Sequence, residues 1–473
     1  MNFLARNFTA GVGLVLITLV QVGGSGLATA DEDPPNGGVL NVQTKDRQEF
    51  DCALATPAWV LWRAPIGTRS GAPVIAGDRI LIGTNNEKRD GAAGGDNMDL
   101  GVLKCFHLQD GKFLWQTTHN RYGGRKTDLP RSPIMSRPTV DGKNAYYVSN
   151  RGELVCVSME TGGIIWMLDM VSDLGIYKVE APDIGNPTSG TLVVDDLVYC
   201  VTGNGGDFEG VPAPDAPSFI AVNKLTGKLA WSSNAPGRNI VYGQWASPVA
   251  AVVGGTKQII FPGGDGYLYG FEPKAGKLLW KIDLGGNVPA GDPHLRGLGR
   301  RNFFVGSPAL DGDTVYVGLA QIPEDISMET RRPVYAVELA VRGGTTVPRI
   351  KWTFDNKNFN GTTASVAVSD GKVYVVSQSG VVFGIDAASG RTLWTSDLGE
   401  QAAFFSNPCV QGGHLYVATG DADLYVFSLG PVPKCQCSIY FDGGIQFTSP
   451  LAVEGRLYLG ADGYLWALQP PLR

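Results

Sequence analysis

The chain is poor in the residue types that most metal and hydrolase sites require. It has 4 histidines among 473 residues, and they are scattered: His107, His119, His294 and His414. No pair of them has the spacing of a metal site, and neither H-E-x-x-H nor G-x-S-x-G occurs. Loop histidines are more often solvated than ligating, so His119 and His294 are expected to contact solvent. The sequence predicts neither a metal site nor a catalytic residue.

Charged residues are also scarce, and the chain has no net positive charge. Charged residues make up 18% of the chain, with 39 basic and 45 acidic side chains and a net charge of −6. This balance favours solubility and gives no general attraction to a polyanion. We therefore expect no nucleic-acid partner.

The cysteines do not form the even, closely spaced set of a disulfide-rich domain. There are 7, and Cys105 and Cys156 occupy the same place in two copies of a repeat, which indicates buried strand positions. The close pair is Cys435 and Cys437. In an oxidising compartment, a bridge from Cys52 to one of that pair remains open; otherwise these residues are small buried hydrophobic groups.

Long hydrophobic runs are missing after the first thirty residues. The N-terminus has an apolar stretch over residues 10–22, then Ala28-Thr29-Ala30, then acidic residues. This layout predicts a cleavable signal peptide over residues 1–30, because a membrane anchor this short and glycine-broken would barely cross a bilayer. The expected product is an exported protein, soluble in the periplasm or outside the cell, with a partly disordered leader over residues 31–56.

Glycine, proline and tryptophan are abundant, and they recur at fixed spacing. The chain has 64 glycines, 29 prolines and 10 tryptophans. The stretch LYGFEPKAGKLLW, from Leu268, has relatives that begin at Leu103, Leu154, Phe219 and Val382. All five place glycine ninth and tryptophan thirteenth. This pattern predicts a β-hairpin with a left-handed glycine in its turn and a large ring that packs between neighbouring units.

A second kind of hairpin precedes each copy. Segments such as SPALDGDTVYVG, from Ser307, alternate apolar and polar residues around a tight turn, and eight of them occur. Four strands per repeat is the signature of a propeller blade. We therefore predict an all-β, eight-bladed propeller over residues 57–473. The last blade runs out of chain after three strands, and residues 57–67, with Trp62, are expected to supply its fourth strand and close the ring.

The longer connections are predicted to gather on one face of the propeller, which marks a binding face. Basic and acidic side chains interleave there: Arg121, Arg125, Lys126, Arg131, Arg296, Arg300 and Arg301 with Asp96, Asp99, Asp207, Glu209 and Asp292. Two interpretations stand, an anion or polar-polymer site and a solvated mixed surface. The expected partner is a protein or polymer, bound by a monomer.

Eight residues are the candidates for a ligand or cofactor pocket on this face. Their loops are expected to be neighbours across blades three to five. They are Asn204, Asp207, Tyr242, Gln244, Trp245, Asp265, Arg296 and Arg301.

The repeated phrase G-x-L-Y-x-x-(D/E)-x-x-x-G-K-x-x-W resembles the repeat of the pyrroloquinoline quinone (PQQ) propeller superfamily. The resemblance spans residue 57 to the C-terminus. That superfamily contains PQQ-dependent alcohol dehydrogenases and the non-enzymatic outer-membrane assembly factors of the BamB type. The resemblance thus implies the fold and leaves an enzyme and a binding protein as alternatives.

The enzyme signatures that the resemblance implies are mostly absent. Asn204, in Thr202-Gly203-Asn204, matches a calcium-binding asparagine, but Tyr242-Gly243-Gln244-Trp245 lacks the expected carboxylate. Ser149-Asn150-Arg151-Gly152 stands where a calcium-ligand glutamate is expected, Gly264-Asp265-Gly266 departs from the dehydrogenase motif, and no two cysteines are adjacent. The sequence favours a non-catalytic, BamB-like binding protein without a cofactor. It lacks the cysteine for a lipid anchor after the apolar run. The alternative is a PQQ- and calcium-dependent alcohol or sugar dehydrogenase with a divergent site.

Overall fold

The computed structural model describes twelve segments of the chain. These are residues 39–44, 48–50, 59–88, 99–121, 130–179, 189–206, 210–286, 301–320, 332–399, 406–420, 423–441 and 448–470. The predicted signal peptide, most of the leader and Cys52 lie outside them. Residues 39–473 form one compact unit, and everything below concerns that unit.

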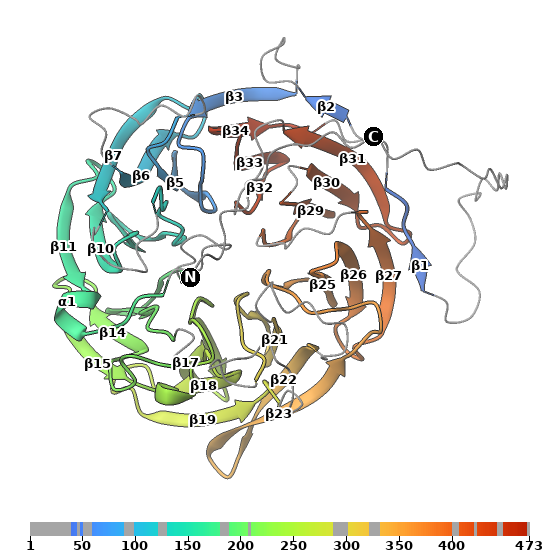
Figure 1. Ribbon diagram of the computed structural model, residues 1–473. Helices are drawn as coiled ribbons and strands as arrows, with labels where there is room; N and C mark the ends of the chain where they lie inside the picture. Colours follow the sequence, from blue (N-terminus) through green and yellow to red (C-terminus); the bar gives the residue numbers. More distant parts are fainter. Residues whose placement is uncertain are drawn as a thin grey trace, which may run out of the picture. The chain divides into compact units, whose positions relative to one another are not determined.

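Eight sheets of four consecutive strands follow one another around an axis (Figure 1). Blade one consists of β4 (Val74–Ala76), β5 (Arg79–Asn85), β6 (Leu100–His107) and β7 (Phe113–Asn120), and blade two of β8 (Thr139–Asp141), β9 (Asn144–Val148), β10 (Glu153–Ser158) and β11 (Ile164–Asp169). Blade three consists of β12 (Leu192–Val194), β13 (Leu197–Val201), β14 (Phe219–Asn223) and β15 (Leu229–Ser233). Blade four consists of β16 (Val249–Val253), β17 (Thr256–Pro262), β18 (Tyr267–Phe271) and β19 (Leu278–Asp283).

Blades five to eight continue the ring. Blade five consists of β20 (Ala309–Asp311), β21 (Thr314–Gly318), β22 (Val334–Arg342) and β23 (Thr345–Phe354), and blade six of β24 (Ala367–Ser369), β25 (Lys372–Val376), β26 (Val381–Asp386) and β27 (Thr392–Asp397). Blade seven consists of β28 (Cys409–Gln411), β29 (His414–Ala418), β30 (Asp423–Ser428) and β31 (Lys434–Phe441). Blade eight consists of β32 (Leu451–Val453), β33 (Arg456–Ala461), β34 (Tyr464–Leu468) and β3 (Val60–Pro65). The predicted all-β, eight-bladed propeller is confirmed.

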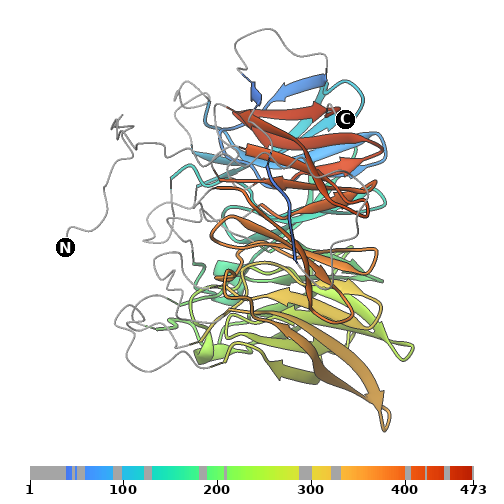
Figure 2. The ribbon, with the colours of Figure 1, turned by 90° about the vertical axis from the view of Figure 1, so that its right-hand side faces the viewer.

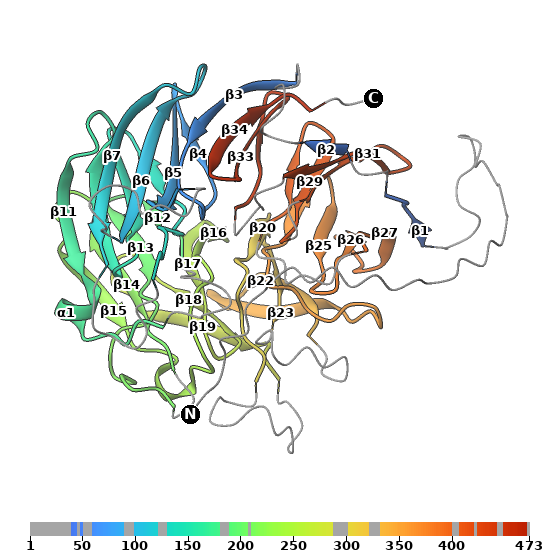
Figure 3. The same ribbon diagram turned by 45° about the horizontal axis from the view of Figure 1, so that its top comes forward.

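The N-terminal strand closes the ring as predicted. β3 pairs antiparallel with β34, so the last blade takes three strands from the C-terminus and one from near the start of the chain. In the tilted view of Figure 3 the first strands of the blades, such as β4, β16 and β20, lie on the side that faces the axis. Closure leaves the ring without the open sheet end that an unclosed array would have.

The leader contributes two further strands that the sequence analysis did not predict. β1 (Leu40–Asn41) pairs in parallel with β27, and β2 (Gln48–Phe50) pairs in parallel with β31. Blades six and seven therefore have five strands each. The leader thus lies along the outer edge of these two blades before the chain enters β3.

Helix is almost absent from the described residues. One helical turn, α1 (Met170–Leu174), begins at Asp169, whose carboxylate accepts hydrogen bonds from the backbone of Val171 and Ser172. A 3₁₀ turn covers Gly237–Asn239. The sequence predicted neither, because one turn is too short to show a helical period. No helix in the described part of the chain is long and apolar enough to cross a bilayer.

The buried core is divided among the seams between blades. Eight clusters of buried hydrophobic residues each draw on two neighbouring blades within the described residues. One of them joins Ala64 and Leu465 of blade eight to Ile80 and Phe106 of blade one. No blade can therefore bury its apolar faces alone, and each depends on both neighbours.

A tryptophan joins most seams by docking on the next blade. Its indole Nε1 donates to a turn carbonyl of the following blade at 2.7 to 3.1 Å, and its ring covers the glycine of that turn. The five pairs are Trp62–Gly111, Trp115–Gly162, Trp166–Gly227, Trp231–Gly276 and Trp352–Gly390. These are the five glycines of the sequence repeat, and the predicted packing of tryptophans between blades is confirmed.

Two physical requirements make these five positions glycine. Their φ angles lie between 66° and 75°, in the left-handed region where a side chain is strained. A Cβ atom there would also lie only 2.4 to 2.8 Å from the docked indole. The fixed spacing of four residues between glycine and tryptophan has the same origin. The glycine of each hairpin turn receives the tryptophan of the preceding blade, and the tryptophan on the outer strand of the same hairpin docks on the next blade.

The seam between blades four and five uses a different contact. Trp280 donates to Gln258 Oε1 at 2.6 Å in its own blade instead of to a turn of blade five. Gln258 in turn donates to Thr346 Oγ1, which belongs to the long β22–β23 hairpin. This hairpin extends beyond the other blades (Figure 2) and places Val341 against the Gly254 turn of blade four. Its extra length replaces the missing tryptophan contact.

Two seams lack the tryptophan contact altogether. The Nε1 of Trp394, on β27 of blade six, is buried without a hydrogen-bond partner in the described residues. The outer strand of blade seven, β31, contains no tryptophan. These seams rest on hydrophobic packing, in which Val42 of the leader takes part.

Replacing a docked glycine should cost far more stability than replacing an undocked one. Gly162 has a φ of 71° and contacts Trp115, whereas Gly142 has a φ of 59° and nothing within 4 Å of its added Cβ. Both Gly→Ala variants carry the left-handed strain of about 1–2 kcal/mol. Gly162→Ala should lose a further 1–3 kcal/mol or so from overpacking. Urea denaturation measures both, and equal losses would contradict the docking role.

Candidate functional site

The structure describes six of the eight predicted pocket residues and brings their loops together. Gln244 Nε2 donates to the carbonyl of Asn204 at 2.9 Å, and Arg301 Nε donates to the carbonyl of Asp265 at 2.9 Å. The rings of Tyr242 and Trp245 lie edge to face, 5.4 Å apart. The remaining two, Asp207 and Arg296, lie outside the described residues. Whether this group binds a ligand stays a prediction.

The side chain of Asn204 is used within the protein. Its Oδ1 accepts from the backbone N–H of Tyr177, and its Nδ2 donates to the carbonyl of Ala213, each at 2.9 Å. The residue is completely buried. Both halves of the amide therefore hold the loops of blade three together.

Asp265 is likewise enclosed. Its carboxylate accepts from the Tyr269 hydroxyl at 2.7 Å and from the backbone N–H of Tyr267 at 3.1 Å. Burial raises the pKa of this carboxyl above its ordinary value, although the hydrogen bond from Tyr269 opposes the rise. Arg301 stacks over the Tyr267 ring and pairs with Asp283. These contacts fix the turn between β17 and β18.

The basic residues of the predicted binding face are paired where the structure describes them. Arg131 lies 2.7 Å from Glu87, Arg121 lies 4.0 Å from Asp99, and Arg301 pairs with Asp283. Exposed pairs of this kind neutralise one another and contribute little to stability. In the described part of this face, the mixed-surface interpretation fits better than an anion site.

Trp245 belongs to a second feature, a cavity on the propeller axis. This axial cavity has a volume of about 630 Å³, in the range of small-molecule sites. All eight blades line it, each with the residue two positions before its first strand: Ala72, Arg137, Gly190, Ser247, Ser307, Ser365, Asn407 and Ser449. Trp245 also lines it. Seven of these eight residues are small or polar without charge, which leaves the space at the axis open.

Backbone hydrogen bonds link these residues around the cavity. The N–H of Ser247 donates to Ser307 Oγ, and the N–H of Ser307 donates to Ser365 Oγ, both at 2.8 Å. The same link runs from Gly190 to Ser247, from Ser365 to Asn407 Oδ1, and from Asn407 to Ser449, at 2.7 to 2.9 Å. Five successive bonds therefore fix the wall of the cavity over blades three to eight.

Arg137 is the one charged side chain among the described residues that line this cavity. It is exposed, and no hydrogen bond or ion pair to its guanidinium is found in the described part of the chain. Burial raises the pKa of Cys409 in blade seven, and the charge of Arg137 in blade two opposes that rise. Trp245 is 4% exposed, and its Nε1 is buried without an acceptor among the described residues.

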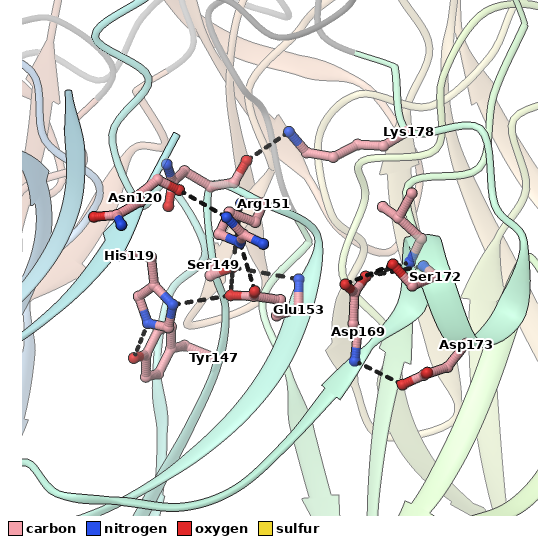
Figure 4. Close-up of polar contacts among 12 residues, drawn as sticks. His119, Asn120, Tyr147, Ser149, Arg151, Glu153, Asp169, Ser172, Asp173 and Lys178 are labelled. Carbon is pink, nitrogen blue, oxygen red and sulfur yellow. Dashed lines mark hydrogen bonds and ion pairs between the residues drawn. The ribbon is translucent and has the colours of Figure 1, made fainter. Parts of the chain in front are cut away.

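A third polar group is buried between blades one and two (Figure 4). The expectation that His119 is a solvated loop residue is wrong, because it ends β7 and is 5% exposed. Its Nδ1 lies 2.9 Å from Glu153 Oε2, and its Nε2 lies 2.8 Å from the Tyr147 hydroxyl oxygen. Ser149 and Arg151 also donate to the Glu153 carboxylate, at 2.8 and 2.6 Å. The Glu153 cluster thus joins blade one to blade two. His294 lies outside the described residues.

The environment of Glu153 favours its charged form. Burial alone would raise the pKa of this carboxyl, but the hydrogen bonds from His119, Ser149 and Arg151 and the nearby positive charge outweigh it and lower the pKa. The Tyr147 hydroxyl has a raised pKa, mainly through burial and secondarily through the Glu153 charge. The cluster is a closed polar network with its hydrogen-bonding groups directed at one another.

Glu153→Gln should destabilise the protein in a pH-dependent way. A buried ionic contact that loses one partner costs about 3 kcal/mol. Since the folded pKa is lowered, the contribution of the carboxylate is present above the ordinary value of about 4.3 and is lost as the pH falls through the folded pKa. Denaturation should show a large difference from wild type at pH 7 that shrinks below about pH 4. Glu338→Gln, which removes an exposed pair with Arg349, is the matched control. Equal losses from the two variants would contradict this role.

Comparison with known proteins places these features in context. A tetrathionate hydrolase from Acidithiobacillus ferrooxidans is 20% identical over 437 residues, 86% of this chain and 74% of that protein. The outer membrane protein assembly factor BamB of Yersinia pestis is 23% identical over 332 residues, which cover 70% of this chain and 72% of that protein. Sequence relatives thus include both an enzyme and an assembly factor.

The solved structure of BamB from Moraxella catarrhalis aligns over 85% of this chain and 94% of its own, with a TM-score of 0.55 and 14% identity. At that identity the likeness shows the fold alone. A family model described as outer membrane protein assembly factor BamB matches residues 99–321 and 332–430. The chain therefore belongs to this family of PQQ-repeat β-propellers.

Proposed function

We propose that this chain is a non-catalytic binding protein of the cell envelope, and that it takes an extended segment of a partner protein during outer-membrane protein assembly. The observation that carries the proposal is the apolar, open outer edge of the early blades. Family membership supports an assembly role, and the layout of the first thirty residues supports export.

The outer strand of blade two is the most apolar of these edges. β11 is the last strand of its sheet in the described structure. Ile164, Ile165 and Met167 on it are 47%, 50% and 49% exposed. β7, β15 and β19 are also edge strands with exposed hydrophobic residues. An exposed apolar edge presents unpaired backbone groups and is a template for another strand.

The leader shows what kind of segment such an edge accepts. Blade edges β27 and β31 are covered by β1 and β2, both added in parallel. Backbone hydrogen bonds supply affinity in this mode, and alternate side chains supply selectivity. By the same geometry, β11 would take an extended partner segment with apolar residues at alternate positions.

The residues present do not fit the calcium and quinone site of the enzyme alternative. Calcium takes six to eight oxygen ligands, usually with several carboxylates. The amide of Asn204 is used by Tyr177 and Ala213, and the carboxylate of Asp265 is used by Tyr269 and Tyr267. No acidic side chain is among the described residues that line the axial cavity. In the part of the chain that is described, no three histidine, cysteine or acidic side chains gather as a metal-binding group.

Complementation tests the assembly role. The chain is expressed with its own N-terminus in a Gram-negative bacterium that lacks its BamB, and the amount of folded outer-membrane β-barrel protein is measured by heat-modifiable gel mobility. We expect partial or full restoration. The double variant Ile165→Lys with Met167→Lys should lose it, because charge on an edge strand blocks strand addition.

Val432→Lys is the control for that variant. Val432 is 43% exposed and lies between β30 and β31, away from the β11 edge. It should restore as well as wild type, with all three proteins exported at equal levels. Restoration by the β11 variant equal to that by Val432→Lys would contradict docking at this edge, and no restoration by wild type would contradict the assembly role.

A quinone titration tests the alternative. Added PQQ and Ca²⁺ should produce neither a bound-quinone absorption spectrum at one equivalent nor dye reduction with alcohols or sugars, because the donor set is incomplete. The apoprotein of a PQQ-dependent alcohol dehydrogenase, reconstituted in parallel, is the positive control. Stoichiometric binding with turnover would establish the enzyme instead.

A further inference from the structure

We propose that the β22–β23 arm binds an acidic, extended segment of a partner protein, which pairs with β23 as an added strand. The arm is the part of this long hairpin from Glu338 to Lys351. It differs from the β11 edge in place and in chemistry, since it belongs to blade five and favours negative charge over apolar residues. The proposal does not depend on the assembly role.

The arm is longer than a blade requires (Figure 2). β23 has 10 residues, whereas the outer strands of the other blades have 5 to 8. Its far end contacts blade four, where Val341 lies against the Gly254 turn and Thr346 accepts from Gln258. β23 is the last strand of its sheet in the described structure, so the backbone groups on its outer side have no strand to pair with there.

The two faces of the arm have different surroundings. Glu338 stands opposite Arg349 in the register and Val337 opposite Ile350, and successive pairs alternate between the faces. One face carries the buried Val337 and Leu339, which belong to the hydrophobic cluster between blades four and five. The other face carries exposed or partly exposed side chains: Glu338, Ala340, Arg342, Thr345, Val347 and Arg349. This second face is the open face of the arm.

The arm carries an excess of positive charge. It has three basic side chains and one acidic one, in a chain whose net charge is −6. Arg349 pairs with Glu338 and lowers the pKa of that carboxyl through its hydrogen bond and its charge, and Lys351 and Arg342 lower it further. One carboxylate thus lies in the field of three cations. Within the described residues, Arg342 and Lys351 have no ion pair of their own.

These features favour a polypeptide over a membrane surface or a second copy. A strand beside β23 gains backbone hydrogen bonds, and acidic residues at its alternate positions would lie next to the basic side chains of the open face. The tip of the arm, Arg342-Gly343-Gly344-Thr345, has no large apolar side chain to insert into a bilayer. Two arms would repel one another, because each carries the same excess charge.

The test is fluorescence anisotropy of a labelled decapeptide of alternating glutamate and valine, titrated with the purified chain. We expect binding at one site per chain that weakens as salt is added, and no binding of the peptide with lysine in place of glutamate. Arg342→Glu with Lys351→Glu should weaken the affinity about tenfold or more, because attraction becomes repulsion. Methylating the backbone nitrogens of the peptide removes the donors that pair with β23 and should abolish binding.

Lys112→Glu with Lys228→Glu is the matched control. These exposed lysines stand directly before the outer strands of blades one and three, and their reversal changes the net charge by the same amount. This variant should bind as wild type does, and urea denaturation without peptide shows whether each variant is folded. Equal affinities of the two double variants would overturn the proposal, as would unchanged binding of the methylated peptide. Failure of the folded wild type to bind the acidic peptide would also overturn it, whether or not the chain binds phosphatidylglycerol vesicles instead.

Discussion

The docking of an indole ring onto a left-handed glycine in the next blade is the contact on which the architecture depends. Each sheet has two apolar faces and no core of its own, so it is stable only between two neighbours. The indole contributes buried area, and its N–H donates a hydrogen bond to a turn carbonyl that would otherwise have no partner at the seam. A Cβ atom on the glycine that receives the indole would clash with the ring and push the two blades apart.

Ring closure then determines where ligands can act. Because every blade has its first strand nearest the axis, the residue two positions before each of these strands lines a common space. Small residues there keep the space open, and Arg137 adds a positive charge. The outer strands have the opposite property, since they end their sheets and expose apolar side chains. The fold thus combines a polar cavity at its centre with apolar strands at its outer edge.

The repeat made the fold predictable. The fixed separation of glycine and tryptophan reports a contact between neighbouring blades, and the missing fourth strand of the last blade identified the role of residues 57–67. β1 and β2 were not predictable in the same way. They have two and three residues and pair in parallel with distant strands, so they leave no alternating pattern.

The candidate site was only partly predictable. The neighbouring loops of Asn204, Gln244 and Asp265 were anticipated, but their engagement with backbone groups and tyrosines depends on contacts that no motif encodes. His119 could have been found, since it continues the buried alternation of Trp115 and Thr117 along β7. Arg137 occupies the place of Ser247 and Ser307 in other blades, and its position in the lining of the axial cavity depends on how the eight blades meet at the axis.

The leader has a consequence for how the ring resists opening. Its two strands lie on blades six and seven, and the chain then enters blade eight through β3. The seams on either side of blade seven are those without a tryptophan contact. β1 and β2 therefore lie on the outer strands of the two blades that meet at the first of these seams. The outer strands of blades six and seven are thus paired with leader strands, whereas β7, β11, β15 and β19 end their sheets in the described structure.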